Sequence, residues 1–318
     1  MRRRGPSVKR SMEEIVTCVA EIGPAGLSLH WRALSVPLAA MKLPFVKMHG
    51  IGNDFVLVDN LSQDLELDTE QIRLLADRRR GIGCDQLLMV ERAQDRQADF
   101  RVRIFNQDGS QSGQCGNGLR CLAAYLRDRG AATGDDIAIA IEPGQGMVRA
   151  RLANGHQVSM NMGPPEFSPR SIPFLAAARA DCYTLRVGSR TVELGAVSMG
   201  NPHAVIRVDD CEAVPIEEFG PAVQSLEEFP EGVNAGFVQI LDEGHVRLRV
   251  YERGVGETLA CGSGACAAVA VGRVRGWLDR SVTVSLPGGD LVVDWAGDDE
   301  PMWLSGPTER AFEGEFEL

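Results

Sequence analysis

The sequence has very few lysines and few aromatic residues, and each shortage excludes a class of function. Lysine occurs only at Lys9, Lys42 and Lys47, although Lys and Arg together number 33 among 318 residues. No lysine follows Asn60, which excludes most lysine-dependent chemistry there, such as a Schiff base, a phosphate-loop lysine or a pyridoxal phosphate anchor. Aromatic residues make up only 6% of the chain, which argues against a platform for stacking nucleic-acid bases.

A net basic charge and a long apolar run are also absent. Asp and Glu number 44, so the formal net charge is −11, and a non-specific nucleic-acid binder is disfavoured. No stretch approaches the ~18 uninterrupted apolar residues of a membrane span. We therefore expect neither a nucleic-acid partner nor a membrane segment. With 44% hydrophobic residues and a length of 318, the chain should form about two globular domains.

Residues 1–40 lack the apolar segment of a secretory signal. The chain begins with Arg2-Arg3-Arg4, but Glu13, Glu14 and Glu21 are among the residues that interrupt every apolar stretch that follows. We expect this segment to be a disordered extension or the product of an upstream start site, with a targeting arm as the alternative. Eight cysteines are too few for a disulfide scaffold, so we expect a cytoplasmic protein with reduced thiols.

Strand signals dominate the remaining chain, and helix signals are few. One helix is predicted from about Thr69 to Arg80, with Asp68 as its N-cap, Gln71 completing a capping box and Gly81 stopping it. Two more helices should follow Cys115 and Cys261. Alternating or β-branched runs predict strands at 45–48, 55–58, 101–105, 137–142, 147–152, 157–162, 246–251, 281–286 and 290–295. This balance indicates the α+β class.

An internal repeat is the most informative feature. Residues 101–105 (RVRIF) resemble 247–251 (RLRVY), and the same offset of 146 carries Cys115-Gly-Asn-Gly onto Cys261-Gly-Ser-Gly. A second echo, Gly52-Asn53 against Gly200-Asn201, has an offset of 148. We infer two related halves about a pseudo-two-fold axis, each supplying one cysteine. The expected boundaries are 41–160 together with the C-terminal strand 307–318 for the first half, and 161–306 for the second.

Each repeated segment places a cysteine at the start of a helix. Unpaired amides and the helix dipole there should lower the thiol pKa from about 8.5 toward neutrality. The glycines that follow allow the backbone to approach a carboxylate closely. A thiolate base on one face of a carbon and a thiol acid on the other can invert a stereocentre. Cys115 and Cys261 therefore predict a racemase or epimerase of a carboxylate that needs no cofactor.

Competing interpretations of the cysteines are weaker. The pairs Cys115/Cys121 and Cys261/Cys266 lack C-x₂-C spacing, and the five histidines form no ligand pattern, so no metal is expected. Residues 262–267 fit G-x-G-x-x-A, but the preceding strand ends too early for a dinucleotide turn. We expect Cys121, Cys266 and Cys84 to be core residues. A proline-type racemase and a thiol-redox or ligand-binding protein remain open as alternatives.

Polar residues near the repeats suggest a site for a zwitterion. Asn106 and Glu252 occupy the same repeat position, directly after a strand, and Arg253 adjoins Glu252. Asn53 and Asn201 each follow a glycine, and His203 could tune a thiol. Taken singly, such residues are more often turn, surface or core residues. Their occurrence near the paired thiols favours a binding site for a zwitterionic substrate.

At these residues the sequence resembles the diaminopimelate epimerase family, from Met41 to Leu318. Seven motifs carry the resemblance in order. They are KMHGIGNDF at 47–55, GIGCDQ at 81–86, FNQDGS at 105–110, QCGNG at 114–118, GNPH at 200–203, VNAGFVQ at 233–239 and YERGVGETLACGSG at 251–264. The chain differs from residues frequent in the family at Gln107 and at Gln111-Ser112-Gly113, where no loss of chemistry is expected.

The resemblance implies a pyridoxal-independent enzyme that interconverts LL- and meso-diaminopimelate in lysine and peptidoglycan precursor biosynthesis. It implies two pseudo-symmetric domains, each a barrel-like β-structure around a central helix, with the active site in the cleft between them. Members of the family are commonly homodimers. By motif match, the acid/base thiols would be Cys115 and Cys261, supported in proton transfer by His203 and Glu252.

The resemblance also implies which residues hold the substrate. The distal carboxylate would be held by Asn53, Asn201, Asn234 and Arg253. The residues near the distal amine would be Gln86, Asn106 and Glu252. The helix-start amides around the reacting carboxylate would be those of Gly116, Asn117, Gly262 and Ser263.

Overall fold

The computed structural model describes residues 16–23, 26–33, 41–113, 115–132, 134–142, 146–152, 157–297 and 299–318. The chain divides into two compact units, one of Met1–Lys42 with Glu317–Leu318 and a larger one, hereafter the body, of Leu43–Phe316.

The smaller unit contains an antiparallel hairpin. Strand β1 (Val16–Gly23) pairs with β2 (Gly26–Ala33), with Val16 opposite Ala33. The expectation of a disordered extension is therefore wrong for these two stretches. The missed signal is an alternation in which Leu27, Leu29 and Trp31 are separated by polar residues, as in a strand. For residues 1–15 and 34–40 the expectation falls outside the described part of the chain.

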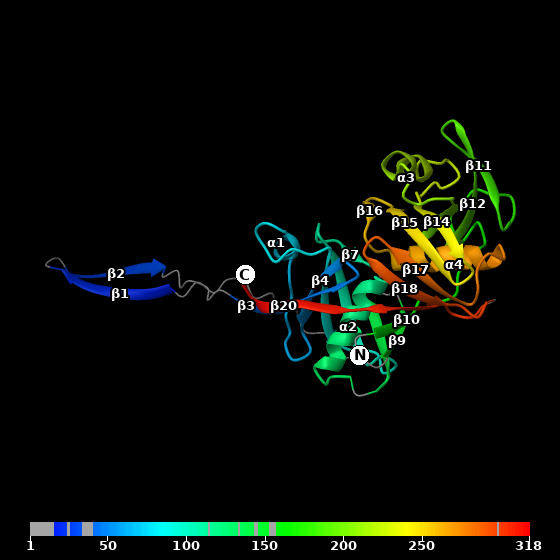
Figure 1. Ribbon diagram of the computed structural model, residues 1–318. Coiled ribbons are helices and arrows are strands. Elements are labelled where there is room, and N and C mark those ends of the chain that lie inside the picture. The colour runs from blue at the N-terminus through cyan, green and yellow to red at the C-terminus, as the bar shows by residue number, and fades with distance from the viewer. Residues whose placement is uncertain are drawn as a thin grey trace, which may run out of the picture. The chain divides into compact units, whose positions relative to one another are not determined.

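The body is a continuous closed sheet with few helices (Figure 1). Its helices are α1 (Thr69–Ala76), α2 (Gly116–Asp128), α3 (Ile216–Gln224) and α4 (Gly262–Val274). The first strands are β3 (Lys42–Gly50), β4 (Asn53–Asp59), β5 (Gln86–Arg92), β6 (Phe100–Asn106), β7 (Gln111–Ser112), β8 (Asp136–Glu142), β9 (Met147–Leu152) and β10 (Gln157–Asn161). The later strands are β11 (Tyr183–Val187), β12 (Arg190–Ser198), β13 (Pro202–Arg207), β14 (Asn234–Asp242), β15 (His245–Glu252), β16 (Gly256–Thr258), β17 (Ser281–Leu286), β18 (Gly289–Asp294), β19 (Trp303–Pro307) and β20 (Glu309–Glu317).

The strand pairings of the body are duplicated. In the first half β4 pairs parallel with β5, β6 parallel with β8, and the pairs β3–β4, β5–β6 and β8–β9 are antiparallel. In the second half β13–β14 and β15–β17 are parallel, and β12–β13, β14–β15 and β17–β18 are antiparallel. The predicted α+β class and internal duplication are thus confirmed. The order supports our proposal of halves at 41–160 with 307–318 and at 161–306.

Helices α2 and α4 fill the interior of the two halves. Both are 13 residues long, and their side chains join one hydrophobic cluster that spans the body. Cys121 in α2, Cys266 in α4 and Cys84 are completely buried, as predicted for core residues. The two helix starts share a neighbour, because a Cβ on Gly116 or on Gly262 would lie 3.6 or 2.8 Å from Cδ2 of Leu304. The starts of α2 and α4 are therefore packed side by side.

Helix α1 begins where it was predicted but ends earlier. Asp68 is its N-cap and shares a capping box with Gln71, yet the helix stops at Ala76 instead of Arg80. The Asp77 carboxylate accepts hydrogen bonds from the backbone N–H groups of Arg79 and Arg80, and this turn replaces the last helical residues.

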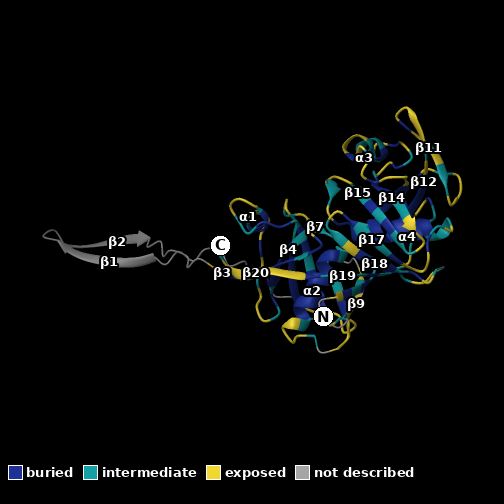
Figure 2. Cartoon of the chain, viewed as in Figure 1, coloured by how far each residue is buried: buried dark blue, intermediate teal, exposed yellow. Residues whose placement is uncertain are grey.

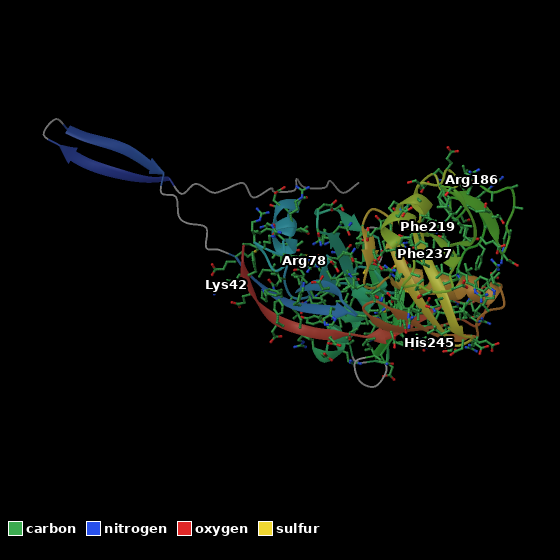
Figure 3. All side chains as sticks on the ribbon, turned by 45° about the horizontal axis from the view of Figure 1, so that its top comes forward. Lys42, Arg78, Arg186, Phe219, Phe237 and His245 are labelled. Atoms are coloured by element: carbon green, nitrogen blue, oxygen red, sulfur yellow. The ribbon has the colours of Figure 1, made fainter. Side chains whose placement is uncertain are left out.

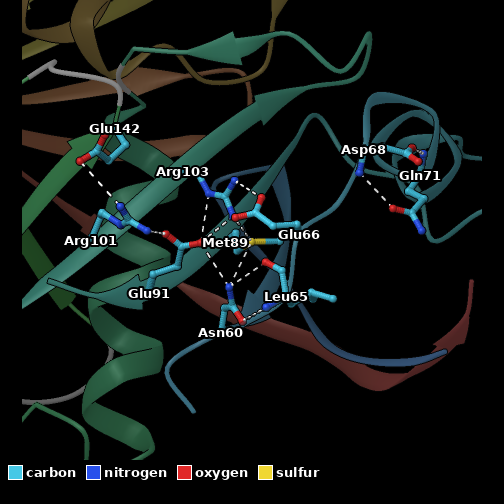
Figure 4. Close-up of polar contacts among 10 residues, drawn as sticks. All are labelled: Asn60, Leu65, Glu66, Asp68, Gln71, Met89, Glu91, Arg101, Arg103 and Glu142. Atoms are coloured by element: carbon cyan, nitrogen blue, oxygen red, sulfur yellow. Dashed lines mark hydrogen bonds and ion pairs between the residues drawn. The ribbon is translucent and has the colours of Figure 1, made fainter. Parts of the chain in front are cut away.

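A buried carboxylate on β5 is paired with arginines of β6 (Figure 4). Glu91 is 5% exposed and accepts hydrogen bonds from Asn60 at 3.2 Å and Arg103 at 2.6 Å, and it also pairs with Arg101. Such pairing offsets the cost of removing the carboxylate from water.

A second, smaller core underlies α3, a helix that the sequence analysis missed. Phe219 of α3 lies 5.8 Å from Phe237 of β14, measured between ring centres (Figure 3). Because Pro221 lies within α3, a pattern-based prediction misses this helix.

Strand β20, which neighbours β3 in the sheet, is exposed along almost its whole length (Figure 2).

Candidate active site

The two repeated cysteines are the N-cap residues of α2 and α4, as predicted. Cys115 has φ −143° and ψ 102°, and Cys261 has φ −128° and ψ 104°, so the backbone enters both helices in the same way. The Cys115 sulfur accepts the N–H of Gly118 at 3.5 Å, and the Cys261 sulfur lies 3.7 Å from the Ser263 hydroxyl. Cys261 is 4% exposed and Cys115 is half-buried. Neither forms a disulfide.

The expected lowering of the thiol pKa at these helix starts is wrong for this structure. Burial raises the pKa of the Cys115 thiol to about 11 and raises that of Cys261 well above 9. Amide donors act in the predicted direction, since the N–H groups of Gly118 and Gly264 lower the pKa of their respective thiols. Their effect is smaller than the cost of placing an anion in an apolar interior. Both groups therefore rest as neutral thiols.

Glu252, at the end of β15, acts on both thiols. Its carboxylate accepts hydrogen bonds from the Thr258 hydroxyl at 2.6 Å and from the Cys261 thiol. Burial raises the pKa of Glu252, and its negative charge raises the pKa of both Cys115 and Cys261. The carboxylate is thus within electrostatic reach of the two groups that would exchange protons with a substrate.

Asn53 and Asn117 connect the first thiol to the sheet. Oδ1 of Asn53 accepts Nδ2 of Asn117 at 3.2 Å and faces the Cys115 thiol at 3.8 Å. Nδ2 of Asn117 also lies 3.5 Å from the carbonyl of Ala260, which precedes Cys261. Oδ1 of Asn117 is buried without a hydrogen-bond partner and faces Gly262. Asn117 therefore lies between the two helix starts.

A row of alternating charges lies behind Asn53. Asp85 accepts Nδ2 of Asn53 at 2.7 Å and pairs with Arg78, which also pairs with Asp54. Lys47 pairs with Asp54 from the other side, at 2.5 Å. Burial raises the pKa of Asp54, but hydrogen bonds from Arg78 and Lys47 outweigh this effect and hold the pKa well below its usual range.

The remaining predicted binding residues form three separate pairs. Gln86 and Asn106 lie opposite each other on β5 and β6, and Nε2 of Gln86 donates to Oδ1 of Asn106 at 2.9 Å. The buried Asn234 accepts the backbone N–H of Arg253 at 2.9 Å. Within the described chain, Arg253 forms no ion pair with Glu252, and its guanidinium donates to the carbonyl of Glu231 at 2.8 Å.

The third pair is His203 and Asn201. Nε2 of His203 lies 3.0 Å from Oδ1 of Asn201, a contact that is a hydrogen bond when Nε2 carries the proton of the neutral ring. Burial, together with the charge of Arg253, lowers the pKa of His203 to about 3. The ring is therefore uncharged near neutral pH.

The sequence analysis missed two residues that hold this site together. Asp85 orients Asn53, and Thr258 donates to Glu252. Asp85 lies in the motif at 81–86, next to Gln86, and Thr258 lies in the motif at 251–264, six residues after Glu252. Their place in the same motifs as predicted site residues was the available signal.

The described part of the chain contains neither a cluster of metal ligands nor a helix that could span a membrane. No three His, Cys, Asp or Glu side chains gather there as metal ligands. No described helix is both long enough and apolar enough to span a bilayer.

Comparison with known proteins agrees with this geometry. The sequence model of the family "Diaminopimelate epimerase" matches residues 45–168 and 195–310. A diaminopimelate epimerase of Alkalilimnicola ehrlichii is 55% identical over 278 residues, covering 87% of this chain and 100% of the relative. One from Chromobacterium violaceum is 52% identical, with the same two coverages.

Solved structures share the fold at low identity. A hydroxyproline epimerase from Agrobacterium vitis has a TM-score of 0.62 at 16% identity, covering 87% of this chain and 93% of that one. A Bacillus anthracis phenazine biosynthesis protein of the PhzF family has a TM-score of 0.63 at 18% identity, covering 87% of this chain and 100% of that one. With duplicated helices capped by cysteines and relatives at half identity or more, the chain belongs to the diaminopimelate epimerase family.

Proposed function

We propose that this protein interconverts LL-2,6-diaminopimelate and meso-2,6-diaminopimelate without pyridoxal phosphate, as an isomerase of lysine and peptidoglycan precursor biosynthesis. The observation that carries the proposal is the pair of N-capping thiols, Cys115 and Cys261, with the Glu252 carboxylate in reach of both. One sulfur removes the α-proton as a thiolate while the other delivers a proton to the opposite face as a thiol. The two exchange roles when the reaction reverses.

The helix starts stabilise the carbanion-like transition state. Amides at Gly116, Asn117, Gly262 and Ser263 form the first turns of α2 and α4, where partial positive charge gathers. A substrate carboxylate held there accepts hydrogen bonds that strengthen as negative charge develops on it. The neutral His203 and the Glu252 carboxylate support the transfer of protons to and from the thiols.

The distal end of the substrate is held by side chains of both halves. Its carboxylate is held by Asn53, Asn201, Asn234 and Arg253. Its ammonium group lies near Gln86, Asn106 and Glu252. A monofunctional amino acid such as proline has no second zwitterion for these groups, which is why we favour diaminopimelate over a proline-type substrate.

The proposal is tested by incubating reduced protein with LL-diaminopimelate in D₂O without pyridoxal phosphate. We expect conversion to the meso isomer with deuterium at the α-carbon. Cys115→Ala and Cys261→Ala should each abolish conversion. Cys182→Ala, a cysteine whose thiol contacts Glu193 on the second half, serves as the matched control and should keep full activity.

Three outcomes would overturn parts of the proposal. Full activity in either Cys115→Ala or Cys261→Ala excludes the two-thiol mechanism. Exchange with proline or hydroxyproline but not with diaminopimelate assigns a different substrate. If both cysteine variants stay active, and the wild type shows a response to oxidant that the variants lack, a thiol-redox protein is favoured.

We also propose that the protein is a cytoplasmic homodimer. Phe312 is 49% exposed on β20 and stacks edge-on with Phe45 at 5.9 Å, so an apolar ring lies on an otherwise open strand. Light scattering of the full chain should give twice the monomer mass of 34.4 kDa. A monomer mass at all concentrations excludes the dimer.

A further inference from the structure

Arg120, in the second turn of α2, is a cation buried without a counter-charge. Its side chain is completely buried, and none of its three guanidinium nitrogens has a hydrogen-bond partner among the described residues. An isolated buried charge costs several kcal/mol, and arginine does not give up its proton inside proteins. The start of a helix is also the end that disfavours cations. Because both effects make this position unfavourable for a charged side chain, we expect a neighbouring group to provide an interaction that offsets them.

Two glycines leave the space that this guanidinium occupies. A Cβ on Gly50, at the end of β3, would lie 3.1 Å from Nη2 of Arg120. A Cβ on Gly306, in β19, would lie 3.3 Å from both Cζ and Nη2. Side chains on helices lean toward the N-terminus, so this position directs the guanidinium toward the Cys115 end of α2. Strands β3 and β19 therefore pack against the charge beside that end.

Among the described residues, the titratable groups whose charge acts on Arg120 are three thiols, and none is a carboxylate. They are Cys115 and Cys121 from α2 and Cys266 from α4. Burial raises the pKa of both Cys121 and Cys266 to about 12, which keeps these two thiols neutral. Cys115 differs because it accepts an amide N–H and is only half-buried. Of the three, it alone can supply an anion beside the guanidinium, against the opposing charge of Glu252.

The second half has no equivalent cation. The offset of 146 that relates Cys115 to Cys261 places Cys266 at the position of Arg120. Cys261 instead donates a hydrogen bond to Glu252, a negatively charged partner. The negative charge of Glu252 therefore acts on both thiols of a nearly symmetric site, but Arg120 opposes it only at Cys115.

We propose that Arg120 is a positioning residue whose buried charge stabilises the Cys115 thiolate, so that Cys115 and not Cys261 ionises first in the protein without substrate. The proton leaves the Cys115 sulfur for solvent, and the guanidinium becomes its counter-ion. The inference rests on the proposed function only in treating both cysteines as the reacting thiols. It adds an order to their ionisation and a residue that sets it.

The test compares wild-type protein with Arg120→Met. Reduced samples react with iodoacetamide from about pH 6 to about pH 11, and peptide mass spectrometry follows each cysteine separately. In the wild type the Cys115 midpoint should lie below that of Cys261. In Arg120→Met the Cys115 midpoint should rise by about one pH unit or more, with about tenfold slower alkylation below the midpoint. The Cys261 midpoint should not move.

Two further variants separate charge from packing. Arg120→Lys keeps a cation and should retain a Cys115 midpoint close to that of the wild type. Arg129→Met removes a cation from the other end of α2, where it pairs with Asp59, and should change neither midpoint. Arg120→Gln replaces Arg120→Met if the latter does not fold, and the same shift is expected of it.

An unchanged Cys115 midpoint in a folded Arg120→Met or Arg120→Gln protein overturns the inference. An equal shift of both midpoints also overturns it, because a structural role would disturb both helix starts. The epimerase assay on the same samples distinguishes the two proposals. Ordered ionisation without conversion of diaminopimelate contradicts the proposed function alone, whereas conversion without ordered ionisation contradicts this inference alone.

Discussion

Asn53 donates a hydrogen bond of 2.7 Å from its side-chain nitrogen to the carboxylate of Asp85, and this bond decides which way its amide faces. The oxygen of the same amide is thereby turned toward α2, where it accepts Nδ2 of Asn117. A rotation of the amide would break both bonds. Asp85, itself paired with Arg78, therefore holds the orientation of a proposed substrate-binding residue.

Asp85→Ala should lower kcat/KM for diaminopimelate by about 10- to 100-fold, because a misplaced positioning group weakens the alignment of the substrate. Asp64→Ala, at an exposed aspartate of the same half, is the matched control and should change kcat/KM by less than about twofold. Steady-state kinetics measures both. Wild-type kinetics in Asp85→Ala would remove Asp85 from the site.

Glu252→Gln keeps the size of the side chain and removes its charge. The pKa of both Cys115 and Cys261 should fall, because the Glu252 carboxylate raises both. Epimerisation should nevertheless decrease by about 10²- to 10⁴-fold, since the proposed proton-transfer partner is lost. Absorbance of thiolates near 240 nm follows the first effect, and chiral chromatography follows the second. Thr258→Val, which leaves the charge in place, should cause the smaller loss of activity.

His203→Gln should make the protein less sensitive to acid. The folded-state pKa of His203 is lowered to about 3, below about 6.5 in the unfolded chain, so protonation favours unfolding. This destabilisation begins below about pH 6.5 and continues until pH reaches the folded-state pKa. Between pH 7 and pH 5 the wild type should lose about 2 kcal/mol of free energy of unfolding that the variant keeps. Urea denaturation at the two pH values measures the difference, and equal losses would contradict a neutral buried ring.

Alkaline conditions should destabilise the fold through its core thiols. Burial raises the pKa of Cys84, Cys121 and Cys266 to about 12, above that of an exposed thiol. Their contribution is fully present below about pH 8.5 and is lost as pH rises toward 12, since the unfolded chain gives up its protons first. From pH 8 to pH 10, Cys266→Ala should lose about 2 kcal/mol less than the wild type. Identical losses would show that Cys266 ionises in the folded protein.

Much of the fold was predictable because it rests on local patterns. Alternation along 246–251 and 281–286 gave β15 and β17 within one residue at each end. The Cys-Gly-x-Gly segments gave both helix starts with their N-caps, since the repeat showed the same residues twice. Local patterns of this kind survive in the folded chain because burial of one face reinforces them.

Other features depend on contacts between distant segments. From sequence alone, an arginine in a helix is predicted to lie at the surface. Arg120 is instead buried against Gly50 and Gly306, which are far away in the sequence. The raised pKa of both N-capping thiols, Cys115 and Cys261, has the same origin, because the surrounding strands and not the helix ends determine their exposure to water. Sequence motifs predicted the two candidate thiols, whereas packing determines their protonation.

The pairing of β10 with β19, and of β20 beside β3, has a consequence for synthesis of the chain. Gln157 lies opposite Pro307, so the first half has an open sheet edge until the last strands have been made. The two halves cannot mature one after the other on the ribosome, as separate domains do. The nascent first half must remain an unfinished sheet until β19 and β20 emerge, and its exposed edge is then the segment that a chaperone would protect.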